Sequence, residues 1–136
     1  MSQIFLNLPV KDVVASMAYY TTMGFTNNPQ LSDDSAKCMV FSEHIHVMLL
    51  SHERFSTFIT KPITNVSQTI SALLSLSVES VARMNEIVNN ALAAGGVEPS
   101  EPKDHGFMQQ RTIEDLDGHT WEIFYMDISQ FSAEEA

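Results

Sequence analysis

The chain has 136 residues, of which 44% are hydrophobic and 18% are charged, so it can fold as one domain around an ordinary core and is not an intrinsically disordered chain. Seventeen acidic residues against seven basic ones give a net charge of −10, which repels phosphate backbones and anionic lipids, so we expect neither a nucleic-acid nor a membrane partner. Cys38 is the single cysteine, which excludes an internal disulfide, and no secretory signal is visible at the start of the sequence, so we expect a cytoplasmic protein.

The first half of the sequence predicts a strand, a helix and a hairpin. The strand covers residues 4–10. The helix follows at about residues 12–23, where apolar side chains recur at helical spacing; Asp12 can cap its start and Gly24 can close its end. Two short apolar runs joined by a polar turn then predict a hairpin, at residues 37–41 and 44–50.

The second half predicts a similar series of elements after a long loop at residues 51–66. An extended segment at residues 70–78 leads into a second helix at about residues 80–94, which ends at Gly95 and Gly96. A strong turn signal, Asp115-Leu116-Asp117-Gly118, then predicts a closing hairpin. Its two strands are expected at residues 107–113 and 120–126.

The two halves repeat one another, which predicts the fold class. Leu8–Val13 lines up with Leu76–Val81, 68 residues later, and the helix-ending glycines and the final strands follow with small drifts in spacing. We therefore predict an α+β protein of two βαβββ modules that form a curled mixed sheet with the helices outside and a cleft for a small molecule. We expect one domain over residues 1–136, with module one at about 3–66, module two at about 69–127 and a polar tail at 128–136.

Two segments carry a resemblance to a known family. The opening segment reads Leu-Pro-Val-Lys-Asp at residues 8–12, followed by the helix and Met-Gly-Phe at residues 23–25. The closing segment, residues 114–122, reads Glu-Asp-Leu-Asp-Gly-His-Thr-Trp-Glu, with Leu116 where proline is common. In these motifs the chain resembles the vicinal-oxygen-chelate superfamily of glyoxalase I, extradiol dioxygenases, fosfomycin-modifying enzymes and bleomycin-resistance proteins, and in particular its predicted lactoylglutathione lyases. The resemblance spans nearly the whole chain.

The resemblance implies a metal site that this sequence does not complete. Family members hold a divalent metal with four inward-facing side chains, one on each of four strands. Glu122 matches the fourth position, whereas the first three fall on Phe5, Met48 and Leu73. Phenylalanine and leucine offer no lone pair, and a thioether is a poor ligand for hard or borderline cations. We therefore expect no cofactor and no metal bound in the family's usual way.

Glu122 and the histidines at 44 and 46 each have two possible roles. Glu122 is the candidate catalytic residue, suited to general acid or base work, or it pairs with a neighbour such as Arg111 and shapes the pocket. His44 and His46 are two apart on a predicted strand, so they face the same side and, with Glu122, form an alternative site for Ni, Zn, Mn or Fe. Otherwise they are two partly solvated histidines near a strand end.

The remaining candidate residues line the predicted cleft. Arg111 either clamps an anionic group of a ligand or forms a surface ion pair. The long loop at residues 51–66 can act as a lid or as a dimer contact, and Cys38 is expected to be a buried, inert thiol. The predicted ligand-binding residues are Phe5, Asn7, Met48, Leu73, Phe107, Arg111 and Phe124.

These observations lead to three functional hypotheses. The first is a small-molecule-binding protein similar to glyoxalase I and the bleomycin-resistance proteins, without the usual catalytic metal and, as the resemblance implies, a homodimer. The second is a metal-dependent enzyme resembling lactoylglutathione lyase or an extradiol dioxygenase. The third is a non-catalytic regulatory or interaction module.

Overall fold

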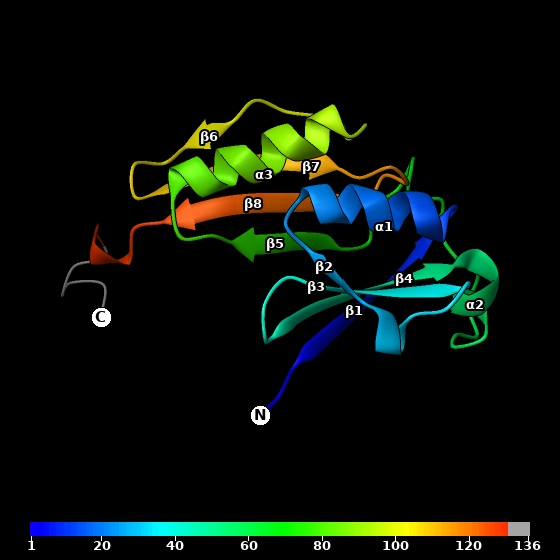
Figure 1. Cartoon of the computed structure of the whole chain (residues 1–136). Helices are drawn as coiled ribbons and strands as arrows, with labels where there is room; N and C mark the ends of the chain where they lie inside the picture. Colours follow the sequence, from blue (N-terminus) through cyan, green and yellow to red (C-terminus); the bar gives the residue numbers. More distant parts are fainter. Residues whose placement is uncertain (131–136) are drawn as a thin grey trace. The chain divides into compact units, whose positions relative to one another are not determined.

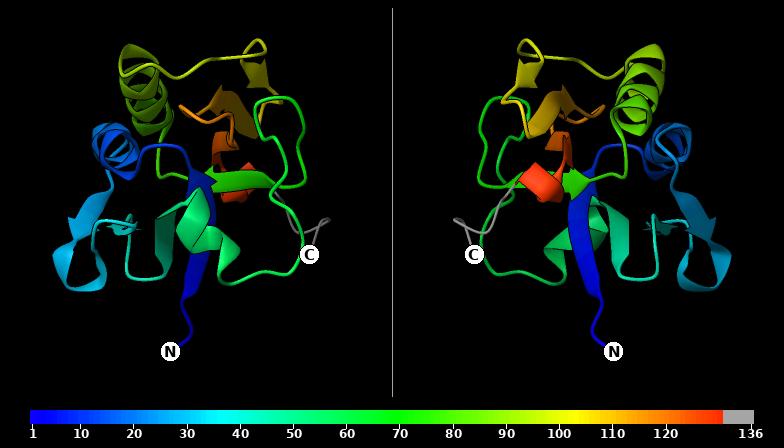
Figure 2. Two further views of the ribbon diagram at one scale, coloured as in Figure 1. Left: turned by 90° about the vertical axis from the view of Figure 1, so that its right-hand side faces the viewer. Right: turned by 90° about the vertical axis from the view of Figure 1, so that its left-hand side faces the viewer.

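The chain folds into two units with the same order of elements, which confirms the predicted pair of βαβββ modules. The computed structural model describes residues 1–130 and divides into a first unit, Met1–Thr69, and a second that begins at Ile70. Each unit has one four-stranded mixed sheet and one long helix (Figure 1 and, from two further sides, Figure 2). We call the two units module one and module two.

Module one places its first and last strands side by side at one edge of the sheet. The sheet order is β1-β4-β3-β2, with β1 parallel to β4 and the other pairs antiparallel. The short helix α2 packs against β1 and β4. The elements are β1 (Ile4–Val10), α1 (Val13–Thr22), β2 (Thr26–Asn28), the 3-10 turn η1 (Pro29–Leu31), β3 (Ala36–Val40), β4 (Ile45–Ser51) and α2 (His52–Ser56).

Helix α1 begins and ends where the sequence predicts. The Asp12 carboxylate accepts hydrogen bonds from the backbone N–H groups of Val14 and Ala15, at 3.1 and 3.0 Å, and so caps the first turn. Gly24, with φ of 102°, lets the chain leave the helix in a left-handed conformation. The helix packs on β3 and β4, whose side chains beneath it are fully buried. This core of module one includes Met39, Val47, Leu49, Tyr19 and Tyr20.

Module two repeats this arrangement. Its sheet order is β5-β8-β7-β6, with β5 parallel to β8, and α3 packs on β7 and β8 (Figure 1). Ser80 caps α3 by accepting a hydrogen bond from the N–H of Arg83 at 3.0 Å. The elements are β5 (Leu73–Ser77), α3 (Val81–Ala93), β6 (Lys103–Asp104), β7 (Met108–Glu114), β8 (Thr120–Met126) and the 3-10 turn η2 (Ile128–Gln130).

The closing turn is held by one buried carboxylate. Asp115 accepts hydrogen bonds from the backbone N–H groups of Asp117, Gly118 and His119 at 3.0, 3.0 and 2.9 Å. Gly118 supplies the positive φ, 99°, that the turn needs. The predicted hairpin is therefore confirmed, and it sets the register in which β7 and β8 pair.

The structure differs from the prediction in its short edge strands and in one short helix. The edge strands β2 and β6 have only three and two residues, too few for a hydrophobic pattern to reveal. The first part of the predicted loop at residues 51–66 is wrong, because His52–Ser56 form α2, with the Ser51 hydroxyl accepting from the Arg54 N–H at 3.1 Å. Most of the predicted tail, residues 131–136, lies outside the described residues.

No helix within residues 1–130 combines the length and apolar character that crossing a membrane requires.

Candidate functional site

Alternating side chains give each sheet two faces. In module two, Ile113, Trp121 and Ile123 point towards α3 and are buried. The residues between them in sequence point to the opposite side, which we call the Glu122 face. By strand register this face carries Leu73, Ser75, Lys103, Gln110, Thr112, Glu114, Glu122 and Phe124.

The Glu122 carboxylate is held by two neutral donors. Ser75 on β5 lies directly across from Glu122 and donates its hydroxyl to Oε1 at 3.2 Å. Gln110 on β7 is buried and donates Nε2–H to Oε2 at 3.4 Å. In the described part of the chain no basic side chain forms an ion pair with Glu122. The carboxylate is therefore oriented by its neighbours, but its charge is not neutralised by them.

Arg111 lies on the other face of this sheet, so the suggested pairing of Arg111 with Glu122 is wrong. The strand register places Arg111 across from Ile123, on the α3 side. There its guanidinium donates to both carboxylate oxygens of Glu98, at 2.8 and 2.9 Å, and to the side-chain oxygens of Asn85 and Asn89, at 3.0 and 3.1 Å. These bonds occupy Arg111 and tie β7 to α3 and to the segment that follows it.

The ion pair between Arg111 and Glu98 shifts both ionisation equilibria. Hydrogen bonds from the guanidinium lower the pKa of Glu98, and the same bonds to Glu98 raise the pKa of Arg111. The two side chains are only 11% and 19% exposed, so this is a largely buried pair and not an ion pair at the surface. The contacts of this pair with β7, α3 and the segment after α3 give it a structural role.

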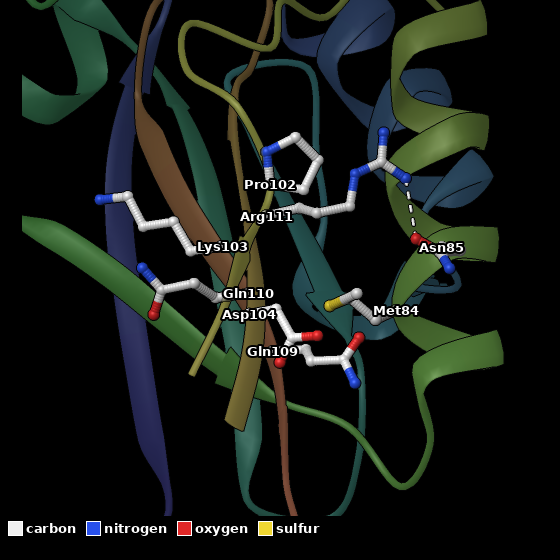
Figure 3. A pocket seen from close by; sticks show the side chains of 8 residues that line it. All are labelled: Met84, Asn85, Pro102, Lys103, Asp104, Gln109, Gln110 and Arg111. Carbon is white, nitrogen blue, oxygen red and sulfur yellow. Dashed lines mark hydrogen bonds between the residues drawn. The ribbon is translucent and has the colours of Figure 1, made fainter. Parts of the chain in front are cut away.

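A cavity of about 270 Å³ lies beside this ion pair (Figure 3). Figure 3 shows Arg111 reaching towards Asn85 on α3, while Lys103 and Gln110 point to the opposite side of the strands. The cavity adjoins the α3 side, and Glu122 does not line it, although Gln110, a donor to Glu122, does. Its lining is Met84, Asn85, Pro102, Lys103, Asp104, Gln109, Gln110 and Arg111.

In module one, the face opposite the α1 side is mainly apolar. We call it the Met48 face; by register it carries Phe5, Asn7, Cys38, His46, Met48 and Leu50. Phe5 is 40% exposed and stacks on the His46 ring, with centroids 4.3 Å apart. Asn7 lies across from Met48, but its amide donates only to the Phe5 carbonyl of its own strand, at 3.2 Å.

Cys38 pairs with Met48 on this face and is completely buried. Burial raises the pKa of the Cys38 thiol, because the low-dielectric interior disfavours the thiolate. These features agree with the inert thiol that the sequence predicts.

The two histidines differ in their surroundings. His46 lies in β4, where Nε2 is 3.0 Å from the Glu43 carbonyl and Nδ1 is buried without a hydrogen-bond partner. His44 lies in the turn before β4, with Nδ1 3.4 Å from the Ser2 carbonyl, so strand alternation does not place the two rings on one side. The alternative site of His44, His46 and Glu122 draws on both modules and remains a prediction.

The side chains at the four positions where the resemblance implies metal ligands do not suit a divalent metal. Phe5 is stacked on an aromatic ring, Leu73 is a half-exposed hydrocarbon, and Met48 offers only a thioether. Within either module, the described residues contain no group of three or more His, Cys, Asp or Glu side chains able to hold a metal. Glu122 is thus left as one carboxylate bonded to a hydroxyl and an amide.

The other predicted ligand-binding residues are spread over two settings. Leu73 and Phe124 both lie on the Glu122 face, on β5 and β8. Phe107 lies just before β7, where its carbonyl accepts from the Asp127 N–H at 2.7 Å.

The sequence analysis missed four residues of the Glu122 face: Ser75, Gln110, Thr112 and Glu114. The turn at Asp115–Gly118 and the 68-residue repeat would have pointed to them.

Comparisons with known proteins agree with this architecture. Residues 3–123 match the model of the Glyoxalase/Bleomycin resistance protein/Dioxygenase superfamily. No curated protein matches the chain.

Solved structures share the fold at low sequence identity. A hypothetical protein, SA1046, from S. aureus superposes with a TM-score of 0.76 at 24% identity, covering 92% of this chain and 94% of the other. A family enzyme from Burkholderia phytofirmans PsJN gives 0.75 at 18% identity, with 93% and 99% covered. A glyoxalase-related enzyme from Fulvimarina pelagi gives 0.75 at 20% identity, with 94% and 91% covered. By its matching model and its paired βαβββ modules, the chain belongs to the glyoxalase/bleomycin resistance protein/dioxygenase superfamily.

Proposed function

We propose that this protein binds a small molecule on the Glu122 face and does so without the divalent metal typical of its superfamily. One observation carries the proposal. Glu122 is oriented by Ser75 and Gln110, while the other three ligand positions carry Phe5, Met48 and Leu73. Of the four positions, only Glu122 keeps a polar side chain that can bind a ligand.

The chemistry of the carboxylate supports a ligand at this position. An ionised carboxylate has about four lone-pair sites for hydrogen bonds. Ser75 and Gln110 use one on each oxygen, which leaves acceptor capacity on a half-buried group. A ligand donor would satisfy that capacity, and Phe124, two residues along the same strand, offers an apolar surface beside it.

Elemental analysis together with a binding screen tests the proposal. Protein purified without chelators is analysed for Ni, Zn, Mn and Fe, and a small-molecule library is screened by ¹H–¹⁵N NMR on the full chain. We expect far less than one metal per chain, and hits that shift the amides around Ser75, Gln110 and Glu122. Stoichiometric metal that disappears in Glu122→Gln would overturn the proposal in favour of a metal-dependent enzyme. A screen in which no compound shifts these amides would favour a regulatory or interaction module.

A further inference from the structure

We propose that the ligand of the Glu122 face carries a protonated amine, which binds the Glu122 carboxylate, and an apolar or aromatic body, which packs on Phe124. This inference rests on the proposed function and names its ligand class. It starts from the charges on the face, since a site that presents unpaired negative charge selects for a cation.

Two carboxylates share this face. Glu114 pairs with Thr120 in register and Thr112 pairs with Glu122, so the two glutamates are diagonal neighbours on adjacent strands. Such neighbours lie about 7–8 Å apart at their backbones. Both are half-buried, and within residues 1–130 neither forms an ion pair with a basic side chain. Their charges therefore add up in one small region.

The arginine and lysine side chains of module two do not cancel this charge. Arg83 pairs with Glu86 on α3, and Arg111 pairs with Glu98 on the α3 side. Lys103 does lie on the Glu122 face, but it stands on β6, across from Gln110. It therefore lies two strands away from Glu122, about 10 Å across the sheet, and two residues away along the strand direction, about 7 Å. No ion pair joins Lys103 to Glu122 in the described part of the chain.

The neighbours of Glu122 suit an ammonium group better than a bare metal ion. An ammonium has up to three N–H donors, and its hydrogen bonds to a carboxylate are charge-assisted. The face offers the Glu122 oxygens, the Thr112 hydroxyl directly across from Glu122 and the side-chain oxygen of Gln110. A transition-metal ion such as Zn²⁺ or Ni²⁺ instead prefers several imidazole, thiolate or carboxylate ligands around one point, which these residues do not supply.

Phe124 defines the other end of the ligand. It lies two residues from Glu122 on β8, across from both Ser77 and Gln110, and it is half-buried. Residues two apart on a strand are about 7 Å apart, which matches the distance from an amine to a ring or alkyl group a few bonds away. The predicted ligand is therefore a compact amphiphilic amine.

Three probes of matched shape test the inference: 2-phenylethylamine, 2-phenylethanol and phenylacetate, which are cationic, neutral and anionic. Each is titrated into the full chain and followed by ¹H–¹⁵N NMR. We expect the amine to bind at least about tenfold more tightly than the alcohol, with shifts centred on Ser75, Gln110 and Glu122, and the acid to bind most weakly. Glu122→Gln removes the preference, whereas Glu79→Gln, an equal charge change at an exposed position, leaves it intact.

A second variant keeps the test decisive if Glu122→Gln folds poorly. Glu114→Gln removes the neighbouring charge without touching the bonds of Ser75 and Gln110 to Glu122, and we expect the preference for the amine to fall about two- to threefold. Equal binding of amine, alcohol and acid at this face would overturn the inference and leave the proposed function standing. Amine shifts that are unchanged in both Glu122→Gln and Glu114→Gln would also overturn it. Stoichiometric metal at Glu122 would overturn both proposals.

Discussion

The two modules share one backbone plan but differ at corresponding positions on both sides of their sheets. Met48 in β4 lies across from Asn7, and Glu122 in β8 lies across from Ser75, at the matching place of the repeat. The first position holds a thioether between Asn7 and the buried Cys38, and the second holds a carboxylate that accepts from two polar donors. Duplication of a fold therefore has not preserved the polarity of its sheet face.

The helix sides differ as well. Arg111 lies across from Ile123 in module two, and Lys37 lies across from Leu49 at the matching place in module one. Arg111 is bound by Glu98, Asn85 and Asn89, whereas Lys37 forms no ion pair among the described residues. Module one thus joins its helix to its sheet by apolar packing, and module two adds a buried charged network.

Replacing these two basic residues should give the largest difference in unfolding free energy between matched variants of the two modules. Arg111→Met leaves the largely buried Glu98 carboxylate without its cation and two asparagine oxygens without a donor, which we expect to cost about 3 kcal/mol of unfolding free energy. Lys37→Met should change the unfolding free energy by no more than about 0.5 kcal/mol, as is usual for a residue without specific partners. Urea unfolding followed by circular dichroism measures both. Equal losses in the two variants would show that the network adds nothing to module two.

Exchanging the residues on the sheet faces tests the second difference. Met48→Glu puts a carboxylate next to the fully buried Cys38 and should cost about 2 kcal/mol. Glu122→Met removes a carboxylate but leaves the buried Gln110 amide without its acceptor, so we expect a smaller loss, about 1 kcal/mol. Urea midpoints at neutral pH give both values. A Met48→Glu variant as stable as the parent would mean that the Met48 face tolerates charge as well as the Glu122 face does.

The sequence predicted the elements with strong local signals and missed those without them. Helix α1 has a capping aspartate and an ending glycine, and the closing hairpin has an Asp-Leu-Asp-Gly turn, so their positions are confirmed. Strands β2 and β6 are too short to show alternation, and α2 is a single short helix inside a polar segment. Their formation depends on pairing and packing partners that are distant in sequence.

The site was predictable where a turn determines the register. The turn at Asp115–Gly118 places Thr112 across from Glu122, which requires Arg111 to point to the opposite side. The stacking of Phe5 on His46 could not be found this way, because β1 and β4 are parallel and no short turn sets their pairing. The hydrogen bond from Gln110 to Glu122 depends on side-chain conformation and not on sequence spacing.

The ion pair of Glu98 with Arg111 in module two should also make stability depend on pH, by a smaller amount. Arg111 lowers the pKa of Glu98 below its usual value of 4.5, so the unfolded chain takes up this proton first as the pH falls. The stabilisation is complete above the unfolded pKa and is lost as the pH falls through the lower, folded pKa. Glu98→Gln lacks this contribution and should lose less stability than the parent between about pH 6 and about pH 3. Parallel urea titrations over that range measure it; identical slopes would contradict the assignment.

The smallest expected effect concerns the donors that lie across from Glu122 and Met48. Ser75 on β5 donates to Glu122 on the neighbouring strand β8, whereas Asn7 bonds only within its own strand. We therefore expect coupling between Ser75 and Glu122 but none between Asn7 and Met48. A double-mutant cycle with Ser75→Ala and Glu122→Gln should give a coupling of about 0.5 kcal/mol, at the low end for a hydrogen bond because this one is exposed. The matched cycle with Asn7→Ala and Met48→Ala should give none. If both cycles gave the same coupling, the polar contact would not distinguish the Glu122 face, and the carboxylate would have to be oriented by Gln110 alone.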